Sequence, residues 1–142
     1  MTFTYLLDTN TFSYIATGVS QAARTEFLRL SQDRDSTIFL SAITEAEVRF
    51  GMAKHKLSRS RRDAIEGLLA NFQILQWGTD EAMAYAETRV VLEAKGITVS
   101  NMDMLIAAHA LATDTVLVSA DKIFAKISDI TGLTIVNWAT DL

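Results

Sequence analysis

Several features are missing from this 142-residue chain. It has no cysteine and no proline, and only six of its residues are glycine. The lack of cysteine excludes disulfides, thiolate zinc sites and cysteine nucleophiles, and it is compatible with a reducing compartment. The lack of proline and the scarcity of glycine leave no linker or low-complexity segment that would divide the chain. We therefore predict one domain over residues 1–142, a typical length for a single domain.

The chain also lacks a long hydrophobic run and a strong charge imbalance. Its net charge is −4, so the overall composition does not point to nucleic acid or a membrane surface. No apolar stretch approaches the roughly 18 residues of a membrane span, and the first apolar run, residues 3–7, has no basic leader. We expect a soluble, cytoplasmic protein with no membrane partner. Hydrophobic residues make up 49% of the chain, enough to bury a core.

Short β-rich runs alternate with longer stretches of helical periodicity. The runs predict strands over residues 3–7, 37–40, 73–75, 115–118 and 133–136. Helices are expected over residues 21–30, after a Ser41 cap, after Ser58 or Ser60, over residues 80–95 before Gly96, and after an Asn101 cap. This alternation predicts an α/β fold with a mostly parallel sheet of about five strands, covered by helices on both faces.

Four acidic residues are predicted to share one edge of that sheet, where the carboxyl ends of parallel strands meet. Asp8 and Asp121 follow strands, Asp103 lies in the first turn of a helix, and Glu47 lies in the helix that leaves the second strand. Glu45 is about 200° away from Glu47 around a helix, so we assign only Glu47 to the pocket.

Each acid also has a purely structural interpretation. Asp8 and Asp121 could cap the helices that follow them, and Asp103 suits the positive end of a helix dipole. Thr44 and Glu47 have the spacing of a capping box. The functional interpretation depends on all four acids lying at the same edge. Carboxylates clustered in this way repel one another and cannot all stay ionised without a cation.

A hard divalent ion such as Mg²⁺ or Mn²⁺ would resolve this repulsion, bound by Asp8, Asp103 and Asp121. Mg²⁺ takes a few carboxylates, several waters and substrate phosphate, and it can activate a bound water for phosphodiester hydrolysis. Thr9, Asn10 and Ser119 are candidates for orienting the acids or a phosphate. The two histidines, His55 and His109, are not placed as a pair of bases, and His109 is interpreted as a core or interface residue.

At this point the sequence resembles a known family, the PIN-domain toxins of the VapC type. The matching segments, in order, are residues 6–10 (LLDTN), 41–51 (SAITEAEVRFG), 101–110 (NMDMLIAAHA), 116–121 (VLVSAD) and 136–138 (VNW). One departure lies in the fourth segment, where the family usually has Thr-Asn before the acid. Here Ser119 keeps a hydroxyl, but Ala120 lacks the amide side chain.

The resemblance implies a PIN-like three-layer sandwich and a metal-dependent endoribonuclease toxin. It implies catalytic acids at Asp8, Glu47, Asp103 and Asp121, RNA substrates that are often transfer RNA, a cognate antitoxin that restrains the enzyme, and a homodimer. These expectations come from the family and not from composition or periodicity.

The segment from Lys54 to Arg62, here called the basic segment, holds five of the thirteen basic residues. The rest of the chain then has eight basic residues against seventeen acidic ones, a net charge of −9. Such a segment suits a phosphate-binding lip, because neutralisation of phosphates supplies most non-specific affinity for nucleic acids; a solvated helix-turn-helix tip is the structural alternative. Arg49, close to Glu47, could bind substrate or balance the acids. The candidate RNA-binding residues are Arg49, Lys54, Lys56, Arg59, Arg61 and Arg62.

Three other functions are open to a chain with this pattern. A phosphatase with Asp8 as nucleophile would want a second acid two residues later, where this chain has Asn10. A receiver-like or structural module would use the acids only as helix caps. A PIN nuclease in RNA maturation, outside a toxin–antitoxin pair, would have the same residues as the toxin.

Overall fold

The computed structural model describes residues 1–142, and its centre is a five-stranded sheet in which every strand pair is parallel. The strand order is β3-β2-β1-β4-β5. The strands are β1 Phe3–Leu7, β2 Ser36–Ser41, β3 Gln73–Leu75, β4 Val116–Val118 and β5 Ile135–Val136. The predicted parallel α/β architecture is confirmed, although β4 and β5 are shorter than the sequence suggested.

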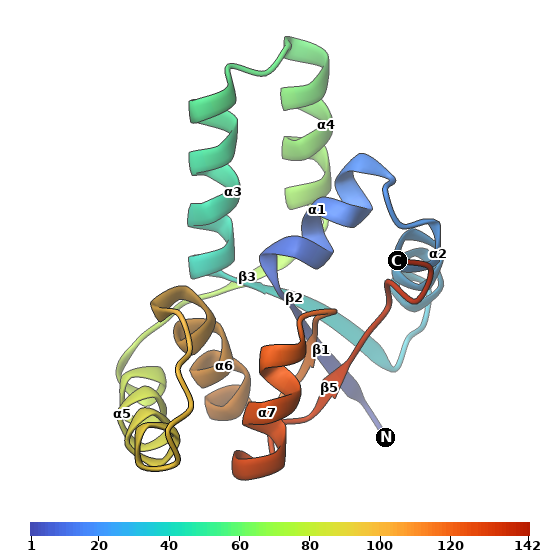
Figure 1. Cartoon of the computed structure of the whole chain (residues 1–142). Helices are drawn as coiled ribbons and strands as arrows, with labels where there is room; N and C mark the ends of the chain where they lie inside the picture. Colours follow the sequence, from blue (N-terminus) through green and yellow to red (C-terminus); the bar gives the residue numbers. More distant parts are fainter.

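Seven helices connect the strands. They are α1 Thr9–Thr17, α2 Gln21–Ser31, α3 Ala42–His55, α4 Arg59–Leu69, α5 Thr79–Ala94, α6 Asn101–Thr113 and α7 Lys122–Thr131. In Figure 1, α5, α6 and α7 cover one side of the sheet and α1 and α2 the other, while α3 and α4 form a hairpin that extends away from the sheet. No helix combines the length and the apolar character needed to cross a membrane.

The three layers follow from side-chain alternation along the strands. Leu6 and Leu7 are both fully buried but belong to different hydrophobic clusters, because successive side chains of a strand point to opposite faces. Leu6 and Leu117 pack with α5, α6 and α7, whereas Leu7, Leu40 and Val118 pack with α1, α2 and the base of the α3–α4 hairpin. Strands β1 to β4 thus contribute apolar side chains to both clusters, as expected for a sheet covered by helices on both faces.

The structure corrects or settles four local expectations about the helices. Helix α1 was not among the helices predicted from periodicity, and it follows directly from a cap by Asp8, as the structural interpretation of that residue allowed. The N-cap of α6 is Ser100, whose Oγ accepts the N–H of Asp103, so Asn101 is the first helical residue. Thr44 and Glu47 form no capping box, because Ser41 caps α3 by accepting the N–H of Ile43. The cap of α4 is Ser58 rather than Ser60.

Candidate active site

Asp8 lies where β1 ends and α1 begins. Its N–H donates to the carbonyl of Val118 (3.1 Å), which continues the β1–β4 pairing by one residue. Its backbone is extended, and its Oδ1 accepts the N–H of Thr11 at 2.8 Å, so Asp8 is the N-cap of α1. The structural interpretation of Asp8 is therefore correct, and it does not exclude a chemical role, because the helix cap occupies only one of the two carboxylate oxygens.

The second oxygen of Asp8 is held by Ser119. The Ser119 hydroxyl donates to Asp8 Oδ2 at 2.6 Å, and its Oγ accepts the N–H of Asp121 at 3.0 Å. Asp8 and Ser119 are both buried. The β4–α7 loop and the end of β1 are therefore joined at this carboxylate, so Ser119 contacts the acid that the sequence suggested it would orient.

Burial raises the pKa of Asp8 above its ordinary value of 3.8, and the negative charge of Asp103 adds to the rise. Hydrogen bonds from Ser119 and Thr11 act in the opposite direction and lower the pKa, but burial is the larger effect. A buried carboxylate that favours protonation gains from a nearby cation, which would stabilise its charged form.

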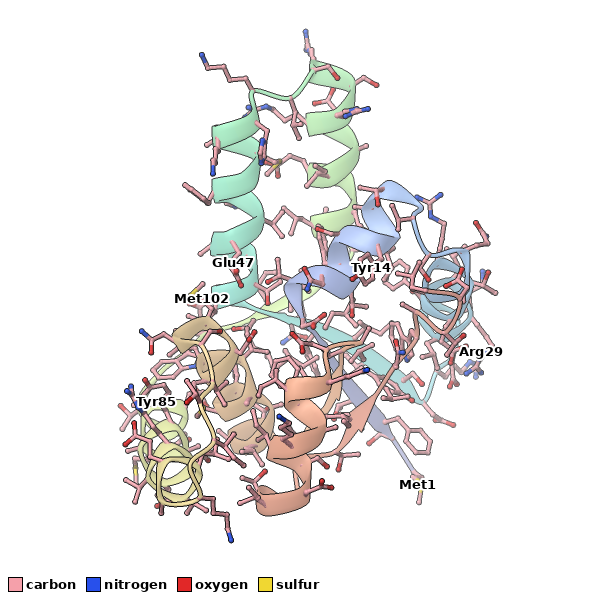
Figure 2. All side chains as sticks on the ribbon, in the orientation of Figure 1. Met1, Tyr14, Arg29, Glu47, Tyr85 and Met102 are labelled. Carbon is pink, nitrogen blue, oxygen red and sulfur yellow. The ribbon has the colours of Figure 1, made fainter.

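Glu47 reaches the same region from α3. Its Oε1 accepts a hydrogen bond from the Thr9 hydroxyl at 2.7 Å, which joins the first turn of α1 to α3. Glu47 is half-buried and lines a cleft between α1, α3 and α4 together with Thr9, Gly51, His55 and Ile65. Figure 2 shows Glu47 at the base of α3, beside the start of α6 at Met102, and these helices pack against each other.

The other predicted site residues differ in their surroundings. Asp103 is half-buried in the first turn of α6, and its charge acts on Asp8. Asp121 is exposed and caps α7, with Oδ1 accepting the N–H of Ile123 at 3.0 Å. Asn10 is exposed in the first turn of α1. The acids thus come from four elements at one edge of the sheet, but Asp121 is directed partly to its own helix.

Thr11 also holds Asp8 in place, and the sequence analysis did not identify it as a site residue. It is buried, and besides its N–H bond to Asp8 it donates its hydroxyl to the carbonyl of Val118 at 3.1 Å. The signal was available, since a Thr three residues after an Asp at a strand end fits the spacing of an N-cap. Thr11 fixes both the acid and the strand beside it.

The oxygen donors at this edge fit a hard divalent cation. Asp8 and Asp103 interact electrostatically, and the neighbouring ligand atoms are hydroxyl and carboxylate oxygens. No group of three or more His, Asp or Glu side chains is already arranged around a metal position. The protein atoms therefore offer a partial set of ligands, of the kind that Mg²⁺ completes with water and substrate phosphate.

The basic segment lies at the tip of the α3–α4 hairpin, at the top of Figure 1. Arg59, Arg61 and Arg62 are exposed in the first turns of α4, and no acidic residue lies in the first turn. Cations at a helix N-terminus oppose the helix dipole, so helix stability does not explain them. Lys54 lies 5.7 Å from the centre of the Phe50 ring.

Arg49 lies on α3 and is occupied by two carboxylates. It pairs with Glu45 at 3.1 Å and with Glu66 of α4 at 2.8 Å. The pair with Glu66 joins the two helices of the hairpin, and as exposed ion pairs both contacts contribute little stability. Glu45, interpreted from the sequence as a solvated surface charge, forms an ion pair with Arg49. The guanidinium of Arg49 is therefore already paired within the hairpin.

We expect Ser119→Ala to lower the metal-dependent RNA cleavage expected from the sequence about 10- to 100-fold, the usual scale for losing a group that orients a metal ligand. Without its hydroxyl donor, the Asp8 carboxylate loses a bond that lowers its pKa, so the acid limb of a pH–rate profile should move to higher pH. The measurement is kcat/KM against pH. Ser31→Ala is the control, because that hydroxyl donates only to the carbonyl of Phe27. An unchanged acid limb would contradict the role of Ser119.

A family model and two relatives match nearly the whole of this chain. The family described as PIN domain matches residues 5–130. Ribonuclease VapC2 of Rickettsia felis is 30% identical over 135 residues, covering 94% of this chain and 97% of the relative. The tRNA(fMet)-specific endonuclease VapC of Salmonella typhimurium is 27% identical over 134 residues, covering 94% and 97%.

A solved structure agrees with these relatives. A chain in the crystal structure of VapBC2 from Rickettsia felis, bound to a DNA fragment from their promoter, superposes with a TM-score of 0.85. It is 29% identical to this chain, and the match covers 96% of this chain and 99% of the other.

Proposed function

This chain belongs to the PIN-domain family of VapC-type ribonucleases, and we propose that it cleaves RNA internally with Mg²⁺ or Mn²⁺ bound at Asp8 and Asp103. The observation that carries this proposal is the environment of Asp8. That carboxylate is buried, is fixed by two hydrogen bonds, and carries a raised pKa to which Asp103 contributes. A divalent ion supplies the charge that this arrangement lacks, and it supplies the polarisation of phosphate and the activation of water.

We propose that the four acids have unequal roles. Asp8 and Asp103 hold the metal, while Asp121 offers its oxygen that does not cap α7. Glu47, restrained by Thr9, faces the substrate side of the site and can orient water or accept a proton. Asn10, exposed beside Asp8, is placed to contact a phosphate. We take residues 1–142 as one nuclease domain.

We further propose that RNA lies along the α3–α4 hairpin. The tip begins about nine residues beyond Glu47, roughly 13 Å along α3. An acidic cleavage site needs separate cations to hold the phosphates, and Lys56, Arg59, Arg61 and Arg62 are exposed there. Arg49 is left out because its guanidinium is paired with two acids.

The basic tip gives a salt-dependent prediction. Replacing Arg61 and Arg62 with alanine should weaken RNA binding and reduce the slope of log K against log salt by about 1.4, from roughly 0.7 per phosphate contact. Binding to transfer RNA would be measured by fluorescence anisotropy in the Asp8→Asn background, which should not cleave the RNA. Lys95→Ala with Lys126→Ala removes two exposed charges elsewhere as the control. Equal slopes for both double variants would refute the tip as an RNA contact.

Cleavage itself is tested on a pool of transfer and ribosomal RNA with Mg²⁺, Mn²⁺ or EDTA. Discrete fragments that require the metal would support the proposal, and we expect transfer RNA as the substrate class. A folded protein that produces no fragments would favour the phosphatase or structural alternative, and a covalent phosphate trapped on Asp8 would identify the phosphatase.

The VapC-type family leads us to propose a toxin that acts in the cytoplasm, restrained by a cognate antitoxin and assembled as a homodimer. Expression should arrest bacterial growth, and co-expression of a DNA-binding protein encoded just upstream should relieve the arrest. Growth that continues despite demonstrated RNA cleavage in vitro would favour a PIN nuclease of RNA maturation.

A further inference from the structure

His109 lies in the interior between the two helices that carry Glu47 and Asp103. It is fully buried in α6, six residues after Asp103 and about 9 Å further along the helix. It is therefore too deep to touch RNA bound at the sheet edge. Burying a polar ring nitrogen is costly unless it is hydrogen-bonded, so the one side-chain contact that His109 makes indicates what it does.

One ring nitrogen contacts the residue that starts α3. His109 Nδ1 lies 2.7 Å from Ser41 Oγ, and Ser41 is also fully buried. Ser41 ends β2 and caps α3, and its Oγ accepts the N–H of Ile43 at 3.0 Å. The hydroxyl proton of Ser41 has no other acceptor, so we assign Ser41 as the donor and Nδ1 as the acceptor.

We infer a neutral ring with its proton on Nε2, the tautomer in which the Ser41 hydroxyl donates to Nδ1. Nε2 has no hydrogen-bond partner, and the backbone of Gln76 is the polar group that favours a proton on the ring. Burial lowers the pKa of His109, and Glu81 of α5 opposes this effect. The ring is thus neutral near pH 7, and it receives a hydrogen bond from Ser41.

The His109–Ser41 contact lies at the same distance in sequence from each of the two acids. Ser41, the N-cap of α3, precedes Glu47 by six residues, and His109 follows Asp103 by six residues on α6. The two helices pack against each other, and His109–Ser41 is the side-chain hydrogen bond between them. Any shift of α3 along α6 would change the separation of the two acids and would also break this bond.

We propose that His109 is a positioning residue that fixes the helix of Asp103 against the helix of Glu47 through its hydrogen bond with Ser41. The inference rests on the proposed metal-dependent cleavage, since it concerns the spacing of the acids used there. His109 does not touch metal, substrate or water in this role.

The test compares substitutions on both sides of the bond. His109→Leu keeps the bulk and removes the acceptor, whereas His109→Asn places an amide oxygen where Nδ1 was. Ser41→Gly removes the hydroxyl but leaves a residue that is nearly as good an N-cap. His55→Asn, at an exposed position on α3, is the control for loss of a histidine.

The primary readout is Mn²⁺ binding by calorimetry, at a temperature where circular dichroism shows every variant to be folded. We expect His109→Leu and Ser41→Gly each to weaken Mn²⁺ binding about 10- to 100-fold, the range for groups that orient metal ligands. Their double variant should lose no more than either one, because both remove the same bond. His109→Asn should recover most of the affinity, and RNA cleavage should follow the same order.

A second readout is independent of metal and activity. Nitrogen-15 NMR of histidine in the wild type should show His109 with a proton on Nε2 alone, while exposed His55 serves as the internal reference. A proton on Nδ1 would overturn the assigned direction of the bond and with it the proposal.

The possible failures are distinguishable. Wild-type Mn²⁺ affinity in folded His109→Leu, or additive losses in the double variant, would overturn the role of His109 and leave the proposed nuclease intact. A wild type that neither binds Mn²⁺ nor cleaves RNA would overturn the proposed function and this inference together. If His109→Leu does not fold, Ser41→Gly applies the same test from the other partner.

Discussion

Asp8→Asn is expected to abolish metal-dependent RNA cleavage while making the protein more resistant to heat. The activity should fall at least about 10²- to 10³-fold, the scale for losing one preorganised electrostatic group in an active site. Asparagine keeps the size of the side chain and an oxygen that can accept the N–H of Thr11, so α1 retains its cap. What disappears is the negative charge that the metal needs.

The rise in stability follows from the direction of the pKa shift. Because the pKa of Asp8 is higher in the folded state, the protonated form favours folding and the charged form disfavours it as pH rises through the folded value. The stability of the variant relative to the wild type should therefore increase as the pH rises from about 4, the ordinary pKa, towards the higher folded pKa of Asp8, and should level off above it. A change of about 1 kcal/mol moves Tm by roughly 3 °C in a domain of this size.

The measurement combines cleavage assays with thermal unfolding monitored at several pH values without divalent metal. Asp129→Asn makes the same chemical change on the exposed surface of α7 and is the control. Retained Mg²⁺-dependent cleavage by purified Asp8→Asn protein would refute the role of Asp8. A Tm difference that is constant across pH would instead show that the gain does not come from its charge.

Asp103→Asn and Asp121→Asn should differ strongly in their effects. Asp103 acts electrostatically on Asp8, so its neutralisation should lower activity at least about 100-fold and raise the metal concentration needed for half-activation. Asp121 is exposed and has one oxygen bonded within α7, so we expect a loss of at most about tenfold.

Thermal stability shows whether a variant of Asp121 loses activity through lost chemistry or through a weakened fold. Asparagine is as good an N-cap as aspartate, so Asp121→Asn should leave Tm unchanged. Asp121→Ala, which removes the cap, should cost about 1 kcal/mol. Metal titrations of cleavage by both Asn variants give the comparison. Equal loss of activity in the two would show that Asp121 is a full metal ligand, contrary to the unequal roles proposed here.

Where the sequence failed, it failed for identifiable reasons. Helix α1, with the sequence TNTFSYIAT, is rich in threonine, serine and asparagine, which are weak helix formers. It forms because Asp8 caps it and because Phe12 and Ile15 are buried against the sheet. Tertiary packing thus overrides local propensity. Ser100 and Asn101 are equally suitable caps, so only the structure could decide between them.

The sequence by itself determined the sheet and the edge at which the acids gather. Apolar runs of strand length, separated by helical periodicity, leave a parallel sheet covered on both faces as the consistent solution, and residues that follow such strands must meet at one edge. Asp8 and Asp121, which follow strands, could therefore be assigned to that edge from their positions in the chain alone.

Only the tertiary structure decided which atoms of that edge work together. Ser119 reaches Asp8 across 111 positions, Thr9 reaches Glu47 across 38, and Ser41 reaches His109 across 68. Local sequence patterns cannot encode these contacts, because each depends on how two separate elements are packed. The burial that raises the pKa of Asp8 has the same origin, since the layers that exclude water from its carboxylate come from β1, β4 and α1 together.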